Sequence, residues 1–259
     1  MSPIETDFMS SGIRRLAMRP LWYLREMEIR SAFRRCPLLL LSNEDDRSEI
    51  ISRFNRNSDD IFVFRNGVNE SSLQPGQVTS NVPTILFYGS WLERKGKTLL
   101  IKAANILDAQ GYTVNWLLVG TGKSSHEIMS EWPKKLHSSV EIIPSVSADD
   151  DDLIYGRASI FVLPSFFEGQ PLTLLQAMES GRTVIASRCC GQKDVIRHGH
   201  NGFLFEPGDD QELASLIAKA LDDTELRLQI GAQAKQDMKL RRWPAVADEV
   251  AIRLENLLN

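Results

Sequence analysis

Short apolar segments alternate with helix-forming segments through the middle of this chain, and no other feature restricts its fold as strongly. The apolar segments hold mainly branched and aromatic side chains in nearly unbroken runs, over residues 84–88, 114–119, 140–143, 159–163 and 183–186. Such runs are typical of strands that are buried on both faces, and intervening helices favour parallel pairing. The sequence therefore predicts an α/β fold with a Rossmann-like parallel sheet and helices on both of its faces.

The remaining elements follow from the same patterns of apolar spacing and turn residues. Helices are expected over 97–109, 125–132, 149–155, 172–180, 211–221, 223–240 and 243–258. Before the main sheet, strands are expected at 36–42 and 60–64, on either side of a helix at 44–54. Residues 70–81 are rich in Ser, Gln, Gly and Pro, a composition typical of a linker.

The composition excludes several classes of protein. Hydrophobic residues make up 42% and charged residues 25% of the 259 residues, which is ordinary for a globular protein. A net charge of -4 gives no reason to expect nucleic acid as a partner, and no apolar run reaches the ~20 residues of a membrane span. Residues 1–11 are polar and partly acidic, so no signal peptide is expected. Three cysteines make no disulfide framework, which favours the reducing cytoplasm.

A basic segment near the amino terminus departs from this balance. Residues 14–35 hold seven arginines against two glutamates, with apolar residues interleaved. This pattern has two interpretations. One is peripheral contact with anionic headgroups at the inner face of a membrane, and the other is a solvated helix face.

The most informative site signal follows the strand at 159–163. A turn with one carboxylate, Glu168, leads at once into a helix, and Pro171 suits the first helical position. The unpaired N–H groups and the dipole of a helix start form an anion site. Ligands of open parallel sheets bind at the carboxyl ends of the strands. A carboxylate beside a phosphate-sized site there suits a nucleotide sugar, which has hydroxyls at one end and phosphates at the other.

Short motifs then recur in a fixed order over more than 150 residues. They are Asn66-Gly67-Val68, Tyr88-Gly89, Lys95-Gly96, Val119-Gly120-Thr121-Gly122, Pro164-Ser165 with Glu168-Gly169, Ala177-Met178, Gly181, Asn201-Gly202-Phe203-Leu204 and Pro207-Gly208-Asp209. With these motifs the chain, from about Pro37 to its end, resembles the carboxyl-terminal, donor-binding part of a retaining GT-B glycosyltransferase of group 1 (glycosyltransferase family 4).

The resemblance implies roles for individual residues. Glu168 matches a carboxylate that binds the sugar hydroxyls of the donor, and Lys95 matches a lysine that neutralises the diphosphate and helps the leaving group depart. The other donor-binding positions are Gly89, Ser90, Arg94, Gly120, Gly122, Pro144, Ser145, Gly169, Gln170, Pro171, Leu172 and Gln176. Pro144 and Ser145 fall in the loop that meets the base. No cofactor and no metal are expected.

Two positions depart from the family pattern. Gln176 stands where the family usually has a second Glu that binds the ribose, and a Gln amide can still hydrogen-bond a diol. Ser90 replaces a phosphate-binding Arg, for which Arg94 is a nearby substitute.

The resemblance also implies a domain organisation. Residues 1–66 match a remnant of the amino-terminal, acceptor-side half, and 67–82 match a linker. Residues 83–242 match the complete donor-binding half, and 243–259 the carboxyl-terminal helix.

The function implied is retaining, metal-independent transfer from a nucleotide sugar to a glycan or lipid-linked glycan, as in polysaccharide biosynthesis. One alternative is a binding module that holds a nucleotide sugar but needs a partner half. A less favoured one is another GT-B activity, that of an epimerase or a phosphorylase.

Two further clusters have plainer interpretations than a ligand site. The acidic run 149–152 resembles a metal site, but its place before a helix favours capping and dipole stabilisation. His198 and His200 fit a simple turn, and the adjacent Cys189 and Cys190 fit packing and turn positions.

Overall fold

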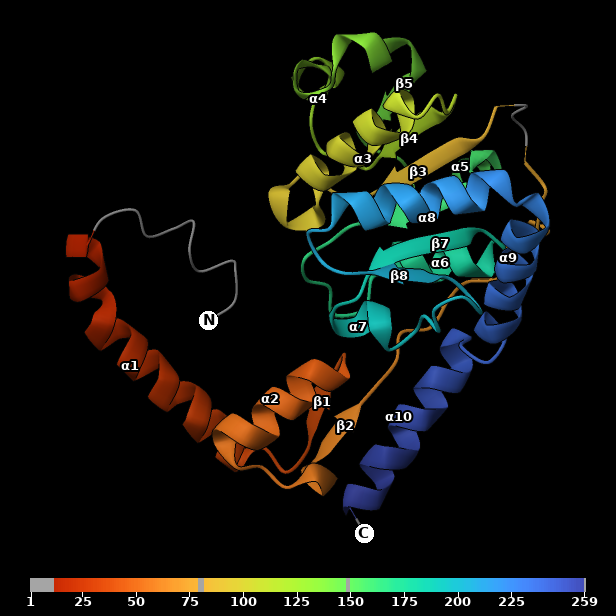
Figure 1. The fold of residues 1–259 in the computed structure, drawn as a ribbon. Helices are drawn as coiled ribbons and strands as arrows, with labels where there is room; N and C mark the ends of the chain where they lie inside the picture. Colours follow the sequence, from red (N-terminus) through yellow and green to blue (C-terminus); the bar gives the residue numbers. More distant parts are fainter. Residues whose placement is uncertain (1–11, 79–81, 148–149, 259) are drawn as a thin grey trace. The chain divides into compact units, whose positions relative to one another are not determined.

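The computed structural model describes residues 12–78, 82–147 and 150–258, and side chains are described within 24–256 of these. It divides into two compact units (Figure 1). The smaller unit comprises Met1–Phe64 with Ala251–Asn259, and the larger comprises Arg65–Val250. The expected domain boundary after residue 66 falls close to this division.

The larger unit is built on one six-stranded, wholly parallel sheet. Its strands are β3 (Thr84–Tyr88), β4 (Asn115–Val119), β5 (Val140–Ile143), β6 (Ile160–Leu163), β7 (Thr183–Ser187) and β8 (Phe203–Phe205). Their order is β5-β4-β3-β6-β7-β8, so the chain builds outward from β3 in one direction and then returns to add β6 on its other side. The predicted parallel sheet is confirmed, and β8 is an additional strand at its edge.

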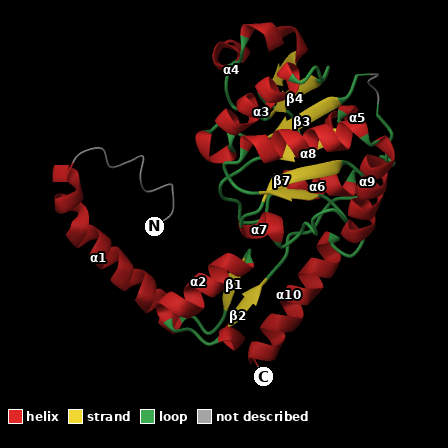
Figure 2. Ribbon diagram, viewed as in Figure 1, coloured by secondary structure: helices red, strands yellow, loops and turns green. Residues whose placement is uncertain are grey.

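Helices cover both faces of this sheet (Figure 2). Along β3, Ile85 and Phe87 belong to one buried cluster and Leu86 to another, as the two-residue period of a strand requires. The first cluster lies under α3 (Lys97–Ala109), α4 (Ser125–Glu131) and α8 (Asp210–Asp222). The second lies under α5 (Asp151–Arg157), α6 (Leu172–Glu179) and the end of α9 (Thr224–Met238). A short helix, α7 (Cys190–Lys193), follows β7 and was not predicted.

The smaller unit holds a two-stranded parallel sheet. Its elements are α1 (Gly12–Arg35), β1 (Leu39–Leu41), α2 (Glu44–Phe54) and β2 (Ile61–Val63). Leu39, Ile50 and Ile61 form its small buried core. The last helix, α10 (Trp243–Leu258), starts in the larger unit and ends in the smaller. Among the described residues, no helix has the length and apolar character needed to span a bilayer.

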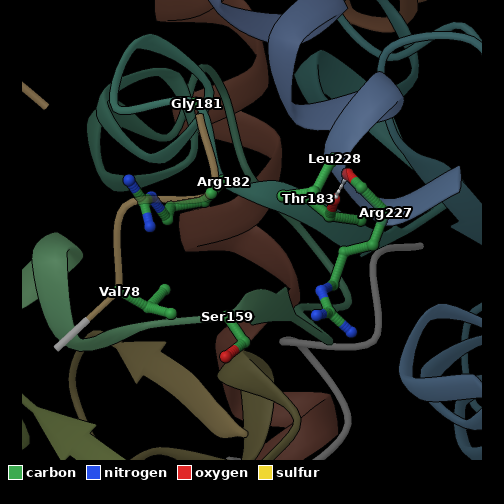
Figure 3. Close-up of a pocket in the computed structure, with 8 residues that line it drawn as sticks. Val78, Ser159, Gly181, Arg182, Thr183, Arg227 and Leu228 are labelled. Carbon is green, nitrogen blue, oxygen red and sulfur yellow. Dashed lines mark hydrogen bonds between the residues drawn. The ribbon is translucent and has the colours of Figure 1, made fainter. Parts of the chain in front are cut away.

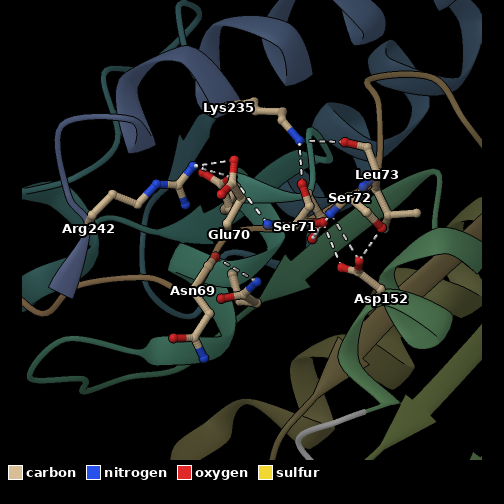
Figure 4. A network of polar contacts seen from close by, with 11 residues as sticks. Asn69, Glu70, Ser71, Ser72, Leu73, Asp152, Lys235 and Arg242 are labelled. Atoms are coloured by element: carbon tan, nitrogen blue, oxygen red, sulfur yellow. Dashed lines mark hydrogen bonds and ion pairs between the residues drawn. The ribbon is translucent and has the colours of Figure 1, made fainter. Parts of the chain in front are cut away.

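The segment expected to be a linker, 67–82, is bound to the larger unit over its described part. The Asp152 carboxylate accepts hydrogen bonds from the hydroxyl of Ser71 (2.7 Å) and from the hydroxyl and N–H of Ser72 (2.6 and 3.0 Å). The ammonium of Lys235 donates to the carbonyls of Ser71 and Leu73 (Figure 4). The prediction of a linker is therefore wrong in its physical sense, because this stretch is a fixed part of the unit.

Arg182 ties the same stretch to the amino edge of the sheet. Its guanidinium is 2% exposed and donates to backbone carbonyls only, those of Gln74, Gln77, Ala158 and Ser180, at 2.8–3.1 Å. A small cavity opens beside it, and Thr183 and Arg227 also line it (Figure 3). Burial lowers the pKa of Arg182 to about 10, so the group stays charged at neutral pH.

Replacing this guanidinium should destabilise the fold strongly. Arg182→Met keeps an apolar stem but leaves four carbonyls without their donor, and we expect the free energy of unfolding to fall by about 3 kcal/mol. Arg188→Met is a matched control, because Arg188 is exposed and pairs only with Glu206; its expected loss is below about 0.5 kcal/mol. Urea unfolding measures both. Similar losses in the two variants would contradict a structural role for Arg182.

Candidate functional site

The candidate site lies at the carboxyl ends of β3 and β6. These two strands are neighbours, yet the chain leaves them toward opposite edges of the sheet. In open parallel sheets, ligands bind in a crevice outside the carboxyl ends of the strands at such a switch point. Lys95 ends a short 3₁₀ helix after β3 (Glu93–Lys95), and Glu168 lies in the loop after β6. The fold therefore brings together Lys95 and Glu168, the two residues to which the family resemblance assigns leaving-group and sugar-binding roles.

Lys95 and Glu168 form an ion pair, with Lys95 Nζ donating to Glu168 Oε1. The Lys95 side chain is 16% exposed and that of Glu168 is 10% exposed. Charges this far from water interact strongly, and each would be costly to leave without a partner. The pair offers a cation suited to phosphate and a carboxylate suited to hydroxyl groups.

Backbone hydrogen bonds join the loops at this edge into one surface. They run from Phe166 N to Arg94 O (2.9 Å), Trp91 N to Thr121 O (2.9 Å), Gly122 N to Pro144 O (3.0 Å) and Gly191 N to Glu168 O (3.1 Å). Successive loops after β5, β4, β3, β6 and β7 are thus connected. The predicted positions Gly89, Ser90, Gly120 and Ser145 lie on three of these loops.

Gly96 makes the close contact between the loops after β3 and β6 possible. Its φ is 78°, and a Cβ atom there would lie 2.0 Å from the carbonyl oxygen of Pro164. No other residue type fits this position. Because Lys95 immediately precedes it, this contact places the ammonium beside the loop of Glu168.

The start of α6 completes the site, with one correction to the sequence analysis. Pro171 is the N-cap residue rather than the first helical residue, and α6 begins at Leu172. The N–H groups of Leu174 and Leu175 donate to the Pro171 carbonyl at 3.1 and 3.2 Å. In the first turn, the N–H groups of Leu172 and Thr173 have no acceptor within the helix. Free N–H groups and the dipole of a helix start favour an anion, so the expectation of an anion site here stays a prediction.

Two predicted donor ligands, Gln170 and Gln176, also have hydrogen-bond partners within the protein. Gln170 Oε1 accepts the backbone N–H of Asn66, and Gln176 Nε2 donates to the Asn69 carbonyl at 3.3 Å. Both partners belong to the segment that leads from β2 into the larger unit. Neither contact was visible in the sequence, because more than 100 residues separate the groups.

A polar layer behind Glu168 was also missed. The Ser165 carbonyl accepts hydrogen bonds from the Ser187 hydroxyl, from Cys189 Sγ (3.3 Å) and from Gln192 Nε2 (3.5 Å). Burial raises the pKa of Cys189 to about 12, which keeps the thiol protonated. The packing role expected of the cysteine pair agrees with these contacts.

The described acidic residues Asp151 and Asp152 bind other side chains of the larger unit. Asp150 is the N-cap residue of α5 but makes no side-chain capping bond, so the capping prediction is wrong at this position; Asp149 lies outside the described residues. Asp151 accepts from the Tyr88 hydroxyl at 3.2 Å, and burial raises the pKa of both groups, that of Tyr88 to about 12. Within the described ranges, no group of three or more His, Cys, Asp or Glu residues could hold a metal ion.

His200 lies in a turn, as expected, whereas His198 precedes the turn and forms a β-bridge with Gly202. The Nδ1 atom of His198 contacts both the carbonyl and the N–H of Leu204 at about 3 Å, so the ring belongs to the packing beside β8.

The family model and the relatives that match this chain all indicate glycosyltransferases. The family model described as "Glycosyl transferases group 1" matches residues 69–237. An uncharacterized glycosyltransferase of Methanocaldococcus jannaschii is 27% identical over 78% of this chain and 57% of its own length. An uncharacterized glycosyltransferase of Haemophilus influenzae is 30% identical over 59% of this chain and 43% of its own length. The chain thus spans about half the length of these relatives.

Solved structures share the fold. Sucrose-phosphate synthase from Thermosynechococcus elongatus matches with a TM-score of 0.77 at 20% identity, over 91% of this chain and 62% of that protein. Anabaena HepE, solved in complex with UDP-glucose, matches with a TM-score of 0.72 at 21% identity, over 85% of this chain and 64% of that protein. The α/β architecture is therefore of the GT-B type.

The polar layer behind Glu168 predicts unequal thiol reactivity. With a pKa near 12, only about one Cys189 thiol in ten thousand is ionised at pH 8, whereas Cys36 is exposed. We expect one thiol to react rapidly with Ellman's reagent in the folded protein. Cys36→Ser should remove that phase, and urea should expose the slow thiols. A second rapid thiol in the folded protein would contradict the packing of this layer.

Proposed function

Because the chain belongs to the glycosyl transferases group 1 family, we propose that its larger unit binds a nucleoside-diphosphate sugar as glycosyl donor. The observation that carries this proposal is the Lys95–Glu168 pair beside the start of α6. One ligand can satisfy all three groups if its phosphates meet the ammonium and the helix terminus while its sugar hydroxyls meet the carboxylate.

On donor binding, Lys95 exchanges Glu168 for phosphate oxygens. The N–H groups of the loop from Gly169 to Leu172 meet the same diphosphate, with Arg94 as a second cation in place of the usual arginine at Ser90. Glu168 then accepts hydrogen bonds from sugar hydroxyls. As the bond between sugar and phosphate breaks, Lys95 and the helix terminus stabilise the developing negative charge.

The nucleoside lies over the loops after β4 and β5. Gly120 and Gly122 have φ values of 66° and 65°, and Pro144 and Ser145 are exposed at the end of β5. Gln176 uses Nε2 for Asn69, and its Oε1 accepts a ribose hydroxyl. Anabaena HepE was solved with UDP-glucose, so UDP-sugars are the first donors to test.

We further propose that transfer retains the anomeric configuration, as the family resemblance implies. We propose that it needs no metal, because Lys95 and the start of α6 supply positive charge on the leaving-group side. The acceptor is a glycan or a lipid-linked glycan. The relative CapM of Staphylococcus aureus is described as a capsular polysaccharide biosynthesis glycosyltransferase, which supports this acceptor class.

The second candidate is a nucleotide-sugar binding module that transfers nothing alone. Gln176 in place of a charged ribose ligand and Ser90 in place of a phosphate-binding arginine favour it. Turnover of a bound donor by the purified chain supports the enzyme, and tight binding without turnover supports the module.

Calorimetric titration with UDP, GDP, ADP and their glucose conjugates tests the donor site. Lys95→Met should weaken binding of the preferred diphosphate at least about tenfold, because a charge-assisted contact is lost. Glu168→Gln should have the opposite effect. It should strengthen binding of the free diphosphate about threefold, because Lys95 loses its competing partner. The same variant should remove the added affinity that the sugar provides.

Lys97→Met and Glu131→Gln are the matched controls, since these residues form a similar pair outside the crevice. Both should bind like the unaltered chain. If Lys95→Met also does so, the proposed donor site is wrong.

We propose that the basic segment 14–35 contacts an anionic membrane surface from the cytoplasmic side. Its described part, in α1, exposes Arg34 and Arg35 together with Leu24 and Met27. This combination of cations and apolar side chains fits a headgroup layer.

Reversing two of these charges tests the membrane proposal. Arg34→Glu with Arg35→Glu should reduce co-sedimentation with phosphatidylserine-containing vesicles at least about tenfold, because each cation near the surface contributes. Lys134→Glu with Lys239→Glu, exposed in the larger unit, gives the same charge change and should retain binding. Equal binding by neutral and anionic vesicles would contradict the proposal.

A further inference from the structure

We propose that Asn66 is a positioning residue for the loop 168–171 and so for the diphosphate-binding start of α6. This inference rests on the proposed donor site and goes beyond it, because Asn66 itself lies outside the crevice loops. It acts through Gln170, which would otherwise be assigned to the donor.

Asn66 makes two hydrogen bonds to this one residue. Its backbone N–H donates to Gln170 Oε1, and its side-chain Nδ2 donates to the Gln170 carbonyl at 3.3 Å. Asn66 is half-buried. The side chain and the main chain of Gln170 are therefore held by the same partner, which restricts both the rotamer and the peptide plane.

The orientation of this peptide plane matters because α6 begins two residues after Gln170. The Gln170 carbonyl belongs to the peptide bond with Pro171, whose nitrogen carries no hydrogen. Peptide groups are planar, so the bond from Nδ2 sets the direction in which the chain enters α6. That direction in turn sets where the N–H groups of Leu172 and Thr173 point.

The other end of the loop is held independently. Gly191 N–H donates to the Glu168 carbonyl at 3.1 Å, and a Cβ on Gly191 would lie 1.7 Å from the Gly169 carbonyl oxygen. In a trans peptide the N–H points away from the carbonyl, so this bond turns the Gly169 N–H away from Gly191. The loop is thus fixed at both ends, by Gly191 at Glu168 and by Asn66 at Gln170.

Asn66 can act as an anchor because its own segment is fixed. Val68 N–H donates to the Arg241 carbonyl at 2.8 Å, and a Cβ on Gly67 would lie 2.7 Å from Trp243. A few residues later, Asp152 and Lys235 hold Ser71 (Figure 4). Because this segment is fixed, the hydrogen bonds of Asn66 also restrict the loop 168–171.

The test uses inorganic pyrophosphate and UDP as probes of the full chain, by calorimetry. Asn66→Ala removes only the side-chain hydrogen bond. We expect it to weaken the binding of both probes by the same factor, about fivefold. A residue that touched the ribose would change UDP binding and leave pyrophosphate unaffected. Gln170→Leu should also weaken binding of both probes. In the double variant, the loss of affinity should be smaller than the product of the losses in the two single variants.

Asn69→Ala is the matched control. Asn69 lies in the same segment, is exposed and contributes its carbonyl to Gln176, so its side chain is dispensable. Hydrogen exchange of the amides at 169–173 provides a readout without ligand. It should accelerate in Asn66→Ala and not in Asn69→Ala.

The outcomes separate the two proposals. If Asn66→Ala binds both probes like the unaltered chain, or leaves exchange at 169–173 unchanged, Asn66 has no positioning role and the donor site stands. If the unaltered chain binds neither probe, the donor site is wrong and the positioning role is wrong with it.

Discussion

The parallel pairing of β3 with β6 is the constraint on which the site depends. Ile85 and Leu86 lie in register with Ile160 and Phe161, although about 75 residues separate them along the chain. Two βα units fold outward on one side before the chain returns to make this pairing. Because all six strands are parallel, their carboxyl ends lie at the same edge of the sheet. As a consequence Lys95 and Glu168, each close behind its strand, share one crevice.

The fold was largely predictable because its strands are unbroken apolar runs with clear ends. The expected helices at 44–54 and 97–109 agree with α2 and α3, and the strands at 84–88 and 140–143 agree with β3 and β5. The failures have a physical cause. β8 is only three residues, Phe203–Phe205, behind a turn-rich stretch, and α7 is a single turn that starts at Cys190 with a φ of 42°. Such elements exist through tertiary contact, which local pattern does not encode.

How much of the candidate site could be predicted from the sequence differed from residue to residue. The family resemblance implied that Lys95 and Glu168 act on the same donor, and the structure places both after neighbouring strands of one sheet. The contacts of Gln170 and Gln176 could not be predicted, because they depend on the path of residues 66–77 across the larger unit. That stretch is polar and contains Gly and Pro, so its composition indicated a linker. Its order comes instead from Asp152, Lys235 and Arg182, whose partners on this segment lie 80 or more residues away along the chain.

The ion pair also explains why one ligand should carry both phosphates and a sugar. Lys95 and Glu168 neutralise each other in a poorly hydrated crevice, and separating them leaves two charges without partners. A free diphosphate satisfies the lysine but leaves the carboxylate exposed to repulsion. A free sugar offers hydroxyls to the carboxylate but nothing to the lysine. Only a ligand that presents both groups at the spacing of the pair replaces both interactions at once. The ion pair between Lys95 and Glu168 therefore favours the proposed intact donor over either of its parts.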